Sequence, residues 1–151
     1  MVALGETKVR SLVKTIGLYR TKAKNVVKLS QELLRKHQGQ VPQEREALQS
    51  LPGVGRKTAN VVLNVAFGEP TIAVDTHVFR LSKRLGFSLG TTPEEVEEDL
   101  LRCVPNEYLP HAHHWLILHG RYVCKARAPL CRTCVLFELC SSPDKHLSSE
   151  E

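Results

Sequence analysis

A short turn with two glycines, Leu51-Pro52-Gly53-Val54-Gly55, separates two segments of helical periodicity and restricts the fold more than any other part of the sequence. Glycine permits positive φ, which a turn this tight requires, and lets another backbone approach closely. We therefore expect a helical hairpin over about residues 43–67. The helix after Gly55 would point free amides and the positive end of its dipole at a ligand such as a phosphate. A tight turn that binds nothing is the alternative.

The rest of the chain has the apolar spacing of three and four residues that is typical of an all-α protein. This spacing predicts helices near 9–16, 23–39, 42–50, 56–67, 76–84, 93–104 and 111–124. Thr92-Pro93-Glu94-Glu95 has the pattern of a capping box. Residues 71–74 could form a strand, but no partner strand is evident, so we expect an extended loop. We expect a helical domain over 1–110, a cysteine-rich region over 111–142 and a frayed tail over 143–151.

The charge pattern favours a polyanionic partner. The chain has 21 Lys and Arg against 16 Asp and Glu, a formal net charge of +5. Residues 1–40 carry nine basic and two acidic side chains, whereas residues 91–110 carry six acidic and one basic. Separate basic and acidic faces are typical of nucleic-acid binders, although an ordinary basic protein has a similar net charge.

Four cysteines crowd into 17 residues near the end of the chain: Cys124, Cys131, Cys134 and Cys140. We see no secretory signal and no membrane span, and expect an intracellular, reducing compartment, the cytoplasm or nucleoid in a bacterium. There, metal binding is favoured over disulfides. Structural zinc usually uses two C-x2-C pairs and this loop has one, so a [4Fe–4S] cluster fits at least as well, and spacing alone leaves both open.

Three motifs in this order resemble the endonuclease III family: Leu51 to Asn60, Val74 to His77 and His114 to Arg121. The resemblance covers about residues 10–140 and extends to the spacing of the cysteines. It implies a helix-hairpin-helix DNA glycosylase and AP (apurinic/apyrimidinic site) lyase. Such an enzyme would act on duplex DNA with an oxidised pyrimidine or an abasic site, cleaving the 3′ side by β-elimination. It also implies that the four cysteines bind a [4Fe–4S] cluster.

Lys57 and Asp75 are the candidate catalytic residues. Lys57 would lie in the first turn of the helix after the hairpin, where the dipole, and burial if present, favour the uncharged amine. Chemistry alone leaves open a surface cation near DNA. The resemblance implies that Lys57 forms a Schiff base, because bifunctional members carry lysine there and adenine-removing relatives do not. Asp75 can cap the next helix. The resemblance places the essential aspartate there, to stabilise charge on the sugar or steer the lysine's proton.

Further residues are candidate DNA contacts. Leu18, after the Gly17 break, matches the family position of a wedge that enters the base stack when a base is flipped, although a loop leucine can also be core. His77 could contact a phosphate. The remaining candidates are the hairpin residues Leu51, Gly53, Val54, Gly55 and Arg56 and the cysteine-loop residues Lys125, Arg127 and Arg132. Histidines 111, 113, 114 and 119 lack a carboxylate to complete a metal site, so we expect them to serve packing and surface contact.

Known family members carry a further N-terminal segment before the equivalent of residue 5, with an apolar central helix and a DNA-inserting loop. Three alternatives therefore stay open. The chain could be a shortened, catalytically weak or inactive DNA-binding remnant, a hairpin scaffold for another repair protein, or a relative of the adenine-mismatch glycosylases. We expect no oligomer for the full family fold, but a shortened chain could associate to cover exposed apolar surface.

Overall fold

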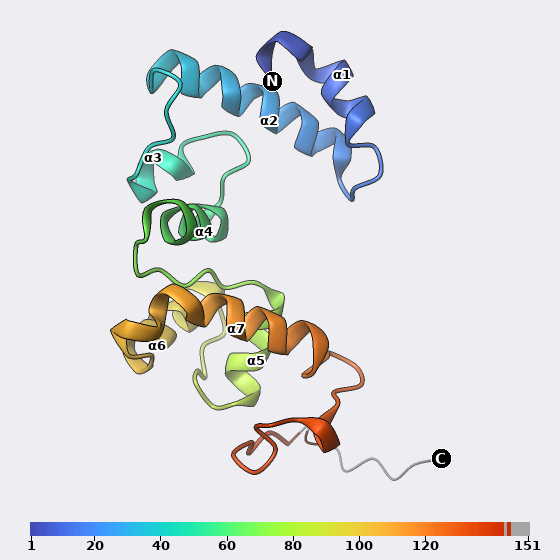
Figure 1. The fold of residues 1–151 in the computed structure, drawn as a ribbon, viewed down its shortest axis with the longest axis vertical. Helices are drawn as coiled ribbons and strands as arrows, with labels where there is room; N and C mark the ends of the chain where they lie inside the picture. Colours follow the sequence, from blue (N-terminus) through green and yellow to red (C-terminus); the bar gives the residue numbers. More distant parts are fainter. Residues whose placement is uncertain (144, 146–151) are drawn as a thin grey trace. The chain divides into compact units, whose positions relative to one another are not determined.

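A computed structural model describes residues 1–143 and 145 of the chain, and every regular element in that part is a helix (Figure 1). The predicted all-α class is confirmed. The chain forms two compact units, Met1–Ala59 and Asn60–Glu151, and each is described by itself below. Among the described helices, none has both the length and the apolar character needed to cross a membrane. Except for Pro143 and Lys145, the tail predicted to fray lies outside the described residues.

The first unit contains the short 3-10 helix η1 (Val2–Leu4), α1 (Gly5–Leu12), α2 (Tyr19–Lys36), α3 (Arg45–Gln49) and the start of α4 (Arg56–Phe67). Figure 1 shows α1 beside α2. The two pack through a small apolar cluster of Val9, Ala23 and Val27. Helix α1 ends four residues earlier than predicted and α2 begins four residues earlier. The break covers residues 13–18 and ends at Leu18, which adopts the left-handed conformation, and α2 starts at the next residue.

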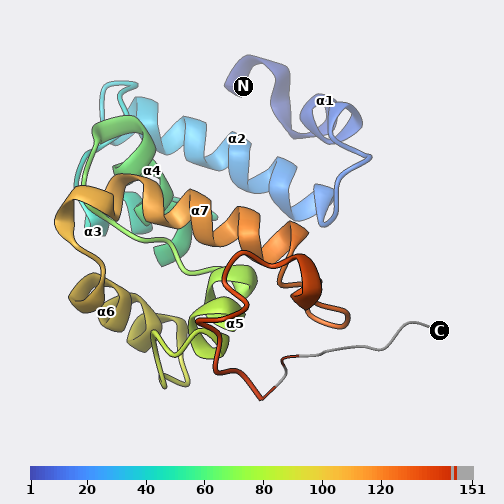
Figure 2. The same ribbon diagram turned by 60° about the horizontal axis from the view of Figure 1, so that its bottom comes forward.

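The second unit contains the rest of α4, then α5 (Thr76–Arg84), α6 (Pro93–Cys103), η2 (Asn106–Tyr108), α7 (Leu109–Tyr122) and η3 (Cys131–Thr133). In Figure 2, α5 lies beside α7, and the loop that follows α7 passes close to α5. The predicted capping box is confirmed. Thr92 accepts from the amide of Glu95, and the Glu95 carboxylate accepts from the amide of Thr92.

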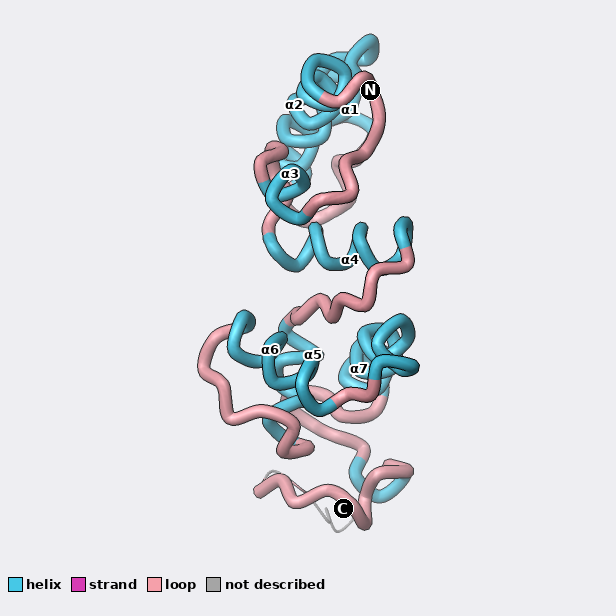
Figure 3. Tube along the Cα trace, turned by 90° about the vertical axis from the view of Figure 1, so that its left-hand side faces the viewer, coloured by secondary structure: helices cyan, strands magenta, loops and turns pink. Residues whose placement is uncertain are grey.

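Residues 69–74 form an extended segment without a partner strand, as expected, and Figure 3 draws this part of the chain as loop. Side chains of α4 satisfy its backbone instead. The Asn60 amide donates to the carbonyl of Ile72 (3.1 Å), and the Asn64 amide donates to the carbonyls of Thr71 and Glu69 (both 3.1 Å). In return, the Thr71 hydroxyl donates to the carbonyl of Asn60 (2.7 Å). A buried backbone needs such partners, so α4 fixes the path of the chain into Asp75.

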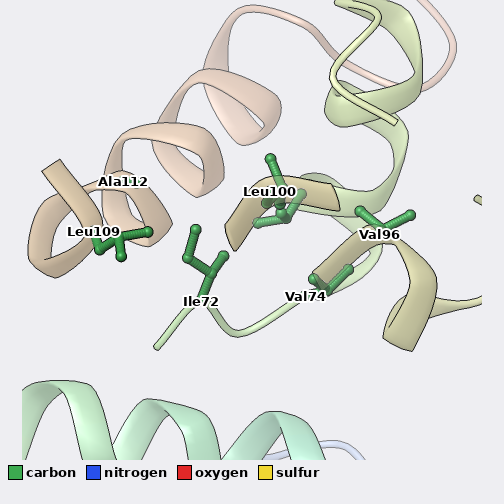
Figure 4. Close-up of a cluster of buried hydrophobic side chains, with 7 residues drawn as sticks. Ile72, Val74, Val96, Leu100, Leu109 and Ala112 are labelled. Atoms are coloured by element: carbon green, nitrogen blue, oxygen red, sulfur yellow. The ribbon is translucent and has the colours of Figure 1, made fainter. Parts of the chain in front are cut away.

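The core of the second unit gathers around this extended segment. Figure 4 shows Ile72 between Leu109 and Ala112 of α7 on one side and Leu100 of α6 on the other, with Val74 and Val96 at the right of the cluster. All of these side chains are buried. The apolar contacts on one side and the asparagine contacts on the other hold the segment in one register.

Candidate functional site

The hairpin turn contains one glycine in the left-handed region. Gly53 has φ +79°, and the amide of Val54 closes the turn on the carbonyl of Leu51 at 3.1 Å. A Cβ at residue 53 would lie 2.7 Å from the Asn25 Nδ2 atom and 2.8 Å from its Cβ. Only glycine fits both the dihedral angle and the space. The side chain of Leu51 is buried, so residue 51 can offer a ligand only its backbone.

Gly55, unlike Gly53, does not have a positive φ. A Cβ there would meet nothing within 4 Å, so the space beside Gly55 is open. The first hydrogen bond of α4 runs from the amide of Ala59 to the carbonyl of Gly55 (3.0 Å). The amides of Lys57 and Thr58 precede that bond and have no acceptor within the helix. The turn therefore presents a helix N-terminus next to a surface that a ligand could approach closely.

Lys57 lies in the first turn of α4, as predicted, and its side chain is exposed. The burial that the sequence left open for this side chain is therefore absent. Arg56 and Val54, the other hairpin candidates, are half-buried.

Asp75 is the N-cap of α5, as predicted. Its Oδ1 atom accepts from the amides of His77 and Val78, both at 2.9 Å. The side chain is half-buried at the end of the fixed extended segment. His77 does not project into solvent, since its Nδ1 atom lies 3.4 Å from the carbonyl of Gly120 in α7. A phosphate contact from His77 would have to use the rest of the ring.

Leu18 is the N-cap of α2 and is 79% exposed, with φ +57°. Its backbone is in the left-handed region that non-glycine residues adopt at a cost of about 1–2 kcal/mol. The alternative of a core leucine is wrong.

The four cysteines are free, half-buried and line one cavity of about 30 Å³ in the second unit, together with His119 and several apolar side chains. The His119 Nε2 atom lies 3.6 Å from Cys134 Sγ, and burial lowers the pKa of His119 below its ordinary value. Among the described residues, no three His, Cys, Asp or Glu side chains converge as a site for a single metal ion.

Comparison with known proteins decides the family. Residues 1–106 match the model of the HhH-GPD superfamily base excision DNA repair protein. Endonuclease III of Escherichia coli strain K12 is 56% identical over 145 residues, which are 96% of this chain and 69% of the relative. Endonuclease III of Haemophilus influenzae is 56% identical over 142 residues, which are 94% and 67% of the two chains.

The chain belongs to the endonuclease III family. A trapped covalent intermediate of endonuclease III with DNA superposes with a TM-score of 0.86 at 50% identity, covering 93% of this chain and 66% of that one. A thermostable thymine-DNA glycosylase superposes with a TM-score of 0.82 at 26% identity and the same coverage. This chain therefore spans about two thirds of the length of its endonuclease III relatives.

Membership confirms the predicted fold and the predicted class, since the endonuclease III family consists of base excision repair enzymes of the DNA glycosylase/AP lyase type.

Two residues at the cysteine loop of this endonuclease III relative could not be found from the sequence. Arg80 and Arg84 of α5 donate hydrogen bonds to the loop. His119, for which we expected packing and surface contact, lines the cavity. Arg80 and Arg84 are four residues apart, so they share a helix face. Their partners, however, are more than 40 residues away, and only the fold identifies them.

Proposed function

We propose that this chain is a base excision repair enzyme that binds damaged duplex DNA and acts as a DNA N-glycosylase and AP lyase on oxidised pyrimidines and abasic sites. One observation carries the proposal. In a chain of the endonuclease III family, an exposed lysine, Lys57, occupies the first turn of α4 directly after the hairpin. A lysine amine can attack an electrophilic carbon and form a covalent intermediate, and this one stands beside the amides at the start of α4 that could bind a phosphate.

The proposed reaction uses this amine. Lys57 Nζ bonds to C1′ of the deoxyribose, and the bond from C1′ to the base breaks with its electron pair on the base, which takes up a proton. Loss of the proton from Nζ and opening of the sugar ring give a Schiff base. Removal of a C2′ proton then breaks the bond from C3′ to oxygen and releases the 3′ phosphate by β-elimination, after which water hydrolyses the imine.

Asp75 would assist without joining the covalent adduct. Its Oδ1 atom is already held by two amides, so the carboxylate has a fixed orientation. A carboxylate near the sugar would stabilise positive charge that develops at C1′, or accept the proton from the lysine. We propose this role for Asp75, in addition to its capping of α5.

DNA binding would use backbone groups at the hairpin. The open space beside Gly55 lets a phosphate reach the amino end of α4, and such contacts position a duplex without reading its sequence. The strained, exposed Leu18 would enter the base stack while the target nucleotide is extruded. The exposed basic residues Lys125 and Arg127 of the cysteine loop, together with Arg132, would meet the phosphate backbone elsewhere.

We further propose that Cys124, Cys131, Cys134 and Cys140 hold a [4Fe–4S] cluster. All four thiols line one cavity. Structural zinc usually uses two C-x2-C pairs and this loop has one, whereas four cysteines with irregular spacing fit a [4Fe–4S] cluster, as the family resemblance implies. When bound, the cluster would cross-link the loop. Anaerobic purification should yield four irons per chain, and stoichiometric zinc would contradict the proposal.

The decisive experiment is borohydride trapping on duplex DNA with one abasic site. Wild type should form a reducible covalent adduct, and Lys57→Gln should form none while binding DNA as tightly, because the hairpin contacts are backbone groups. Lys83→Gln is the matched control, since Lys83 is an exposed lysine late in α5 and should trap as wild type. Trapping by Lys57→Gln at the wild-type rate would exclude this nucleophile. Wild type that binds DNA without trapping would instead be a DNA-binding protein without lyase activity.

A further inference from the structure

Two arginines on one face of α5 contact the residues around the first cysteine of the loop. Arg80 Nη2 donates to the carbonyl of Gly120 at 2.6 Å and to that of Cys124 at 2.9 Å. The Gly120 carbonyl lies in the last turn of α7, where the helix itself supplies no donor. Arg80 therefore closes the end of α7 and fixes the backbone of Cys124.

Arg84, one turn further along α5, reaches the cysteine side chain itself. Its Nη1 atom lies 3.4 Å from Cys124 Sγ and donates to the carbonyl of Lys125 at 2.7 Å. Its Nη2 atom donates to the carbonyl of Ala126 at 3.1 Å. One half-buried guanidinium thus binds the sulfur and the two carbonyls that follow it. In Figure 2 the loop after α7 passes along α5.

These contacts matter for a ligand to iron. A thiolate bound to a cluster carries negative charge, and an arginine is always charged and donates in a fixed planar fork. Groups that hydrogen-bond to metal ligands tune metal affinity by about 10- to 100-fold. Hydrogen bonds to the sulfurs also set the reduction potential of an iron–sulfur cluster, since they stabilise the more negative, reduced state.

We propose that Arg84 is a positioning residue for the cluster. Its hydrogen bonds fix the orientation of the Cys124 side chain for binding iron together with the other three cysteines. Its hydrogen bond to Cys124 Sγ also raises the reduction potential of the cluster. The inference rests on the proposed [4Fe–4S] cluster. Arg84 itself does not bind iron, so its loss should change how firmly the cluster is held and how readily it is reduced.

The test compares three variants of the full chain, purified without oxygen, with wild type. Arg84→Met removes all donors, Arg84→Lys keeps the charge but lacks the planar fork, and Lys83→Met is the matched loss of a positive charge from an exposed neighbour on α5. Two properties are measured on protein free of DNA. The first is the rate at which an iron chelator bleaches the visible absorbance, and the second is the reduction potential.

We expect Arg84→Met to bleach about tenfold faster or more and to have a lower potential than wild type. Arg84→Lys should keep most of the potential but still bleach faster, because one ammonium cannot bind the sulfur and both carbonyls. Lys83→Met should match wild type in both. If Arg84→Met does not fold, as judged by circular dichroism, the test rests on Arg84→Lys. Faster bleaching than wild type would then support the proposal, and bleaching at the wild-type rate would contradict it.

The outcomes separate the two proposals. Wild type without iron would refute the cluster, and the role of Arg84 with it. Wild type with four irons, and Arg84 variants that bleach at the wild-type rate with an unchanged potential, would overturn only the role of Arg84. Equal changes in Arg84→Met and Lys83→Met would overturn it too, because they would reflect charge at a distance.

Discussion

Asn25 of α2 packs directly against the backbone of Gly53 in the hairpin turn, leaving no space for a Cβ at residue 53. This contact ties the turn to α2 within the first unit. Gly53→Ala should therefore destabilise the fold by about 2–4 kcal/mol, the sum of a strained positive φ and an overpacked contact. Urea unfolding followed by circular dichroism measures the change. Gly53→Ala should cost less when it is made in an Asn25→Gly background than in wild type, because the packing part of the loss is then absent and the cost of glycine in α2 is common to both members of the pair. Wild-type stability in Gly53→Ala would show that the turn relaxes freely.

Gly55, two residues later, should behave in the opposite way. A side chain there meets open space, so Gly55→Leu should change the free energy of unfolding by no more than about 1 kcal/mol, the range of N-cap preferences. It would, however, fill the place proposed for a phosphate. We expect affinity for every duplex, damaged or not, to fall about tenfold or more, as measured by fluorescence anisotropy at fixed salt. Unchanged affinity, or a loss confined to one sequence, would contradict the phosphate-binding role of the hairpin.

The two roles of Asp75 can be separated by substitution. Asn is as good an N-cap as Asp, whereas Asp75→Ala loses the cap and should cost about 1 kcal/mol. Asp75→Asn should thus unfold like wild type yet trap abasic DNA with borohydride more slowly, because an amide cannot take up the lysine's proton. Equal trapping rates in wild type and Asp75→Asn would leave Asp75 with its structural role only.

The capping box of α6 predicts a pH dependence. Hydrogen bonds from the Thr91 and Thr92 amides hold the pKa of Glu95 below its ordinary value of 4.5. A carboxyl group whose pKa is lower in the folded than in the unfolded state stabilises the fold fully at pH values above its unfolded-state pKa. This stabilisation is lost as the pH falls through the folded-state pKa. Glu95→Gln should be less stable than wild type at pH 7, and the gap should close on acidification below pH 4.5. A gap independent of pH would mean that the hydrogen bonds do not depend on the charge.

Local signals in the sequence predicted the helices with strong caps or breaks well. The starts and ends of α4 and α5 agree with the prediction, and Gly55 and Asp75 directly precede the two helices. The boundary between α1 and α2 was misplaced, because α1 already ends at Leu12 and the break ends at Leu18, where leucine gives no sign of a left-handed backbone.

The candidate site was predicted where a residue's role is local, as for the capping by Asp75. It was not predicted where partners come from distant segments. Nothing in the sequence distinguishes Asn60, Asn64 and Arg84 from other polar residues of a helix. In the structure, the two asparagines donate to the extended segment and Arg84 donates to the cysteine loop. Of the two glycines in the hairpin turn, Gly53 has a positive φ and Gly55 does not.

The extended segment before Asp75 has a length that cannot vary freely. Connections between helices usually tolerate insertions, because they run over the surface. Here the side chains of Asn60 and Asn64 donate hydrogen bonds to three carbonyls of the segment, those of Glu69, Thr71 and Ile72. At its other end, two amides of α5 donate to the Asp75 carboxylate. One added residue would force the chain to give up a buried pairing or to bulge into the core around Ile72. The segment therefore sets the distance along the chain between α4 and Asp75. Its number of residues determines where Asp75 lies, so this length is as much a part of the site as the aspartate itself.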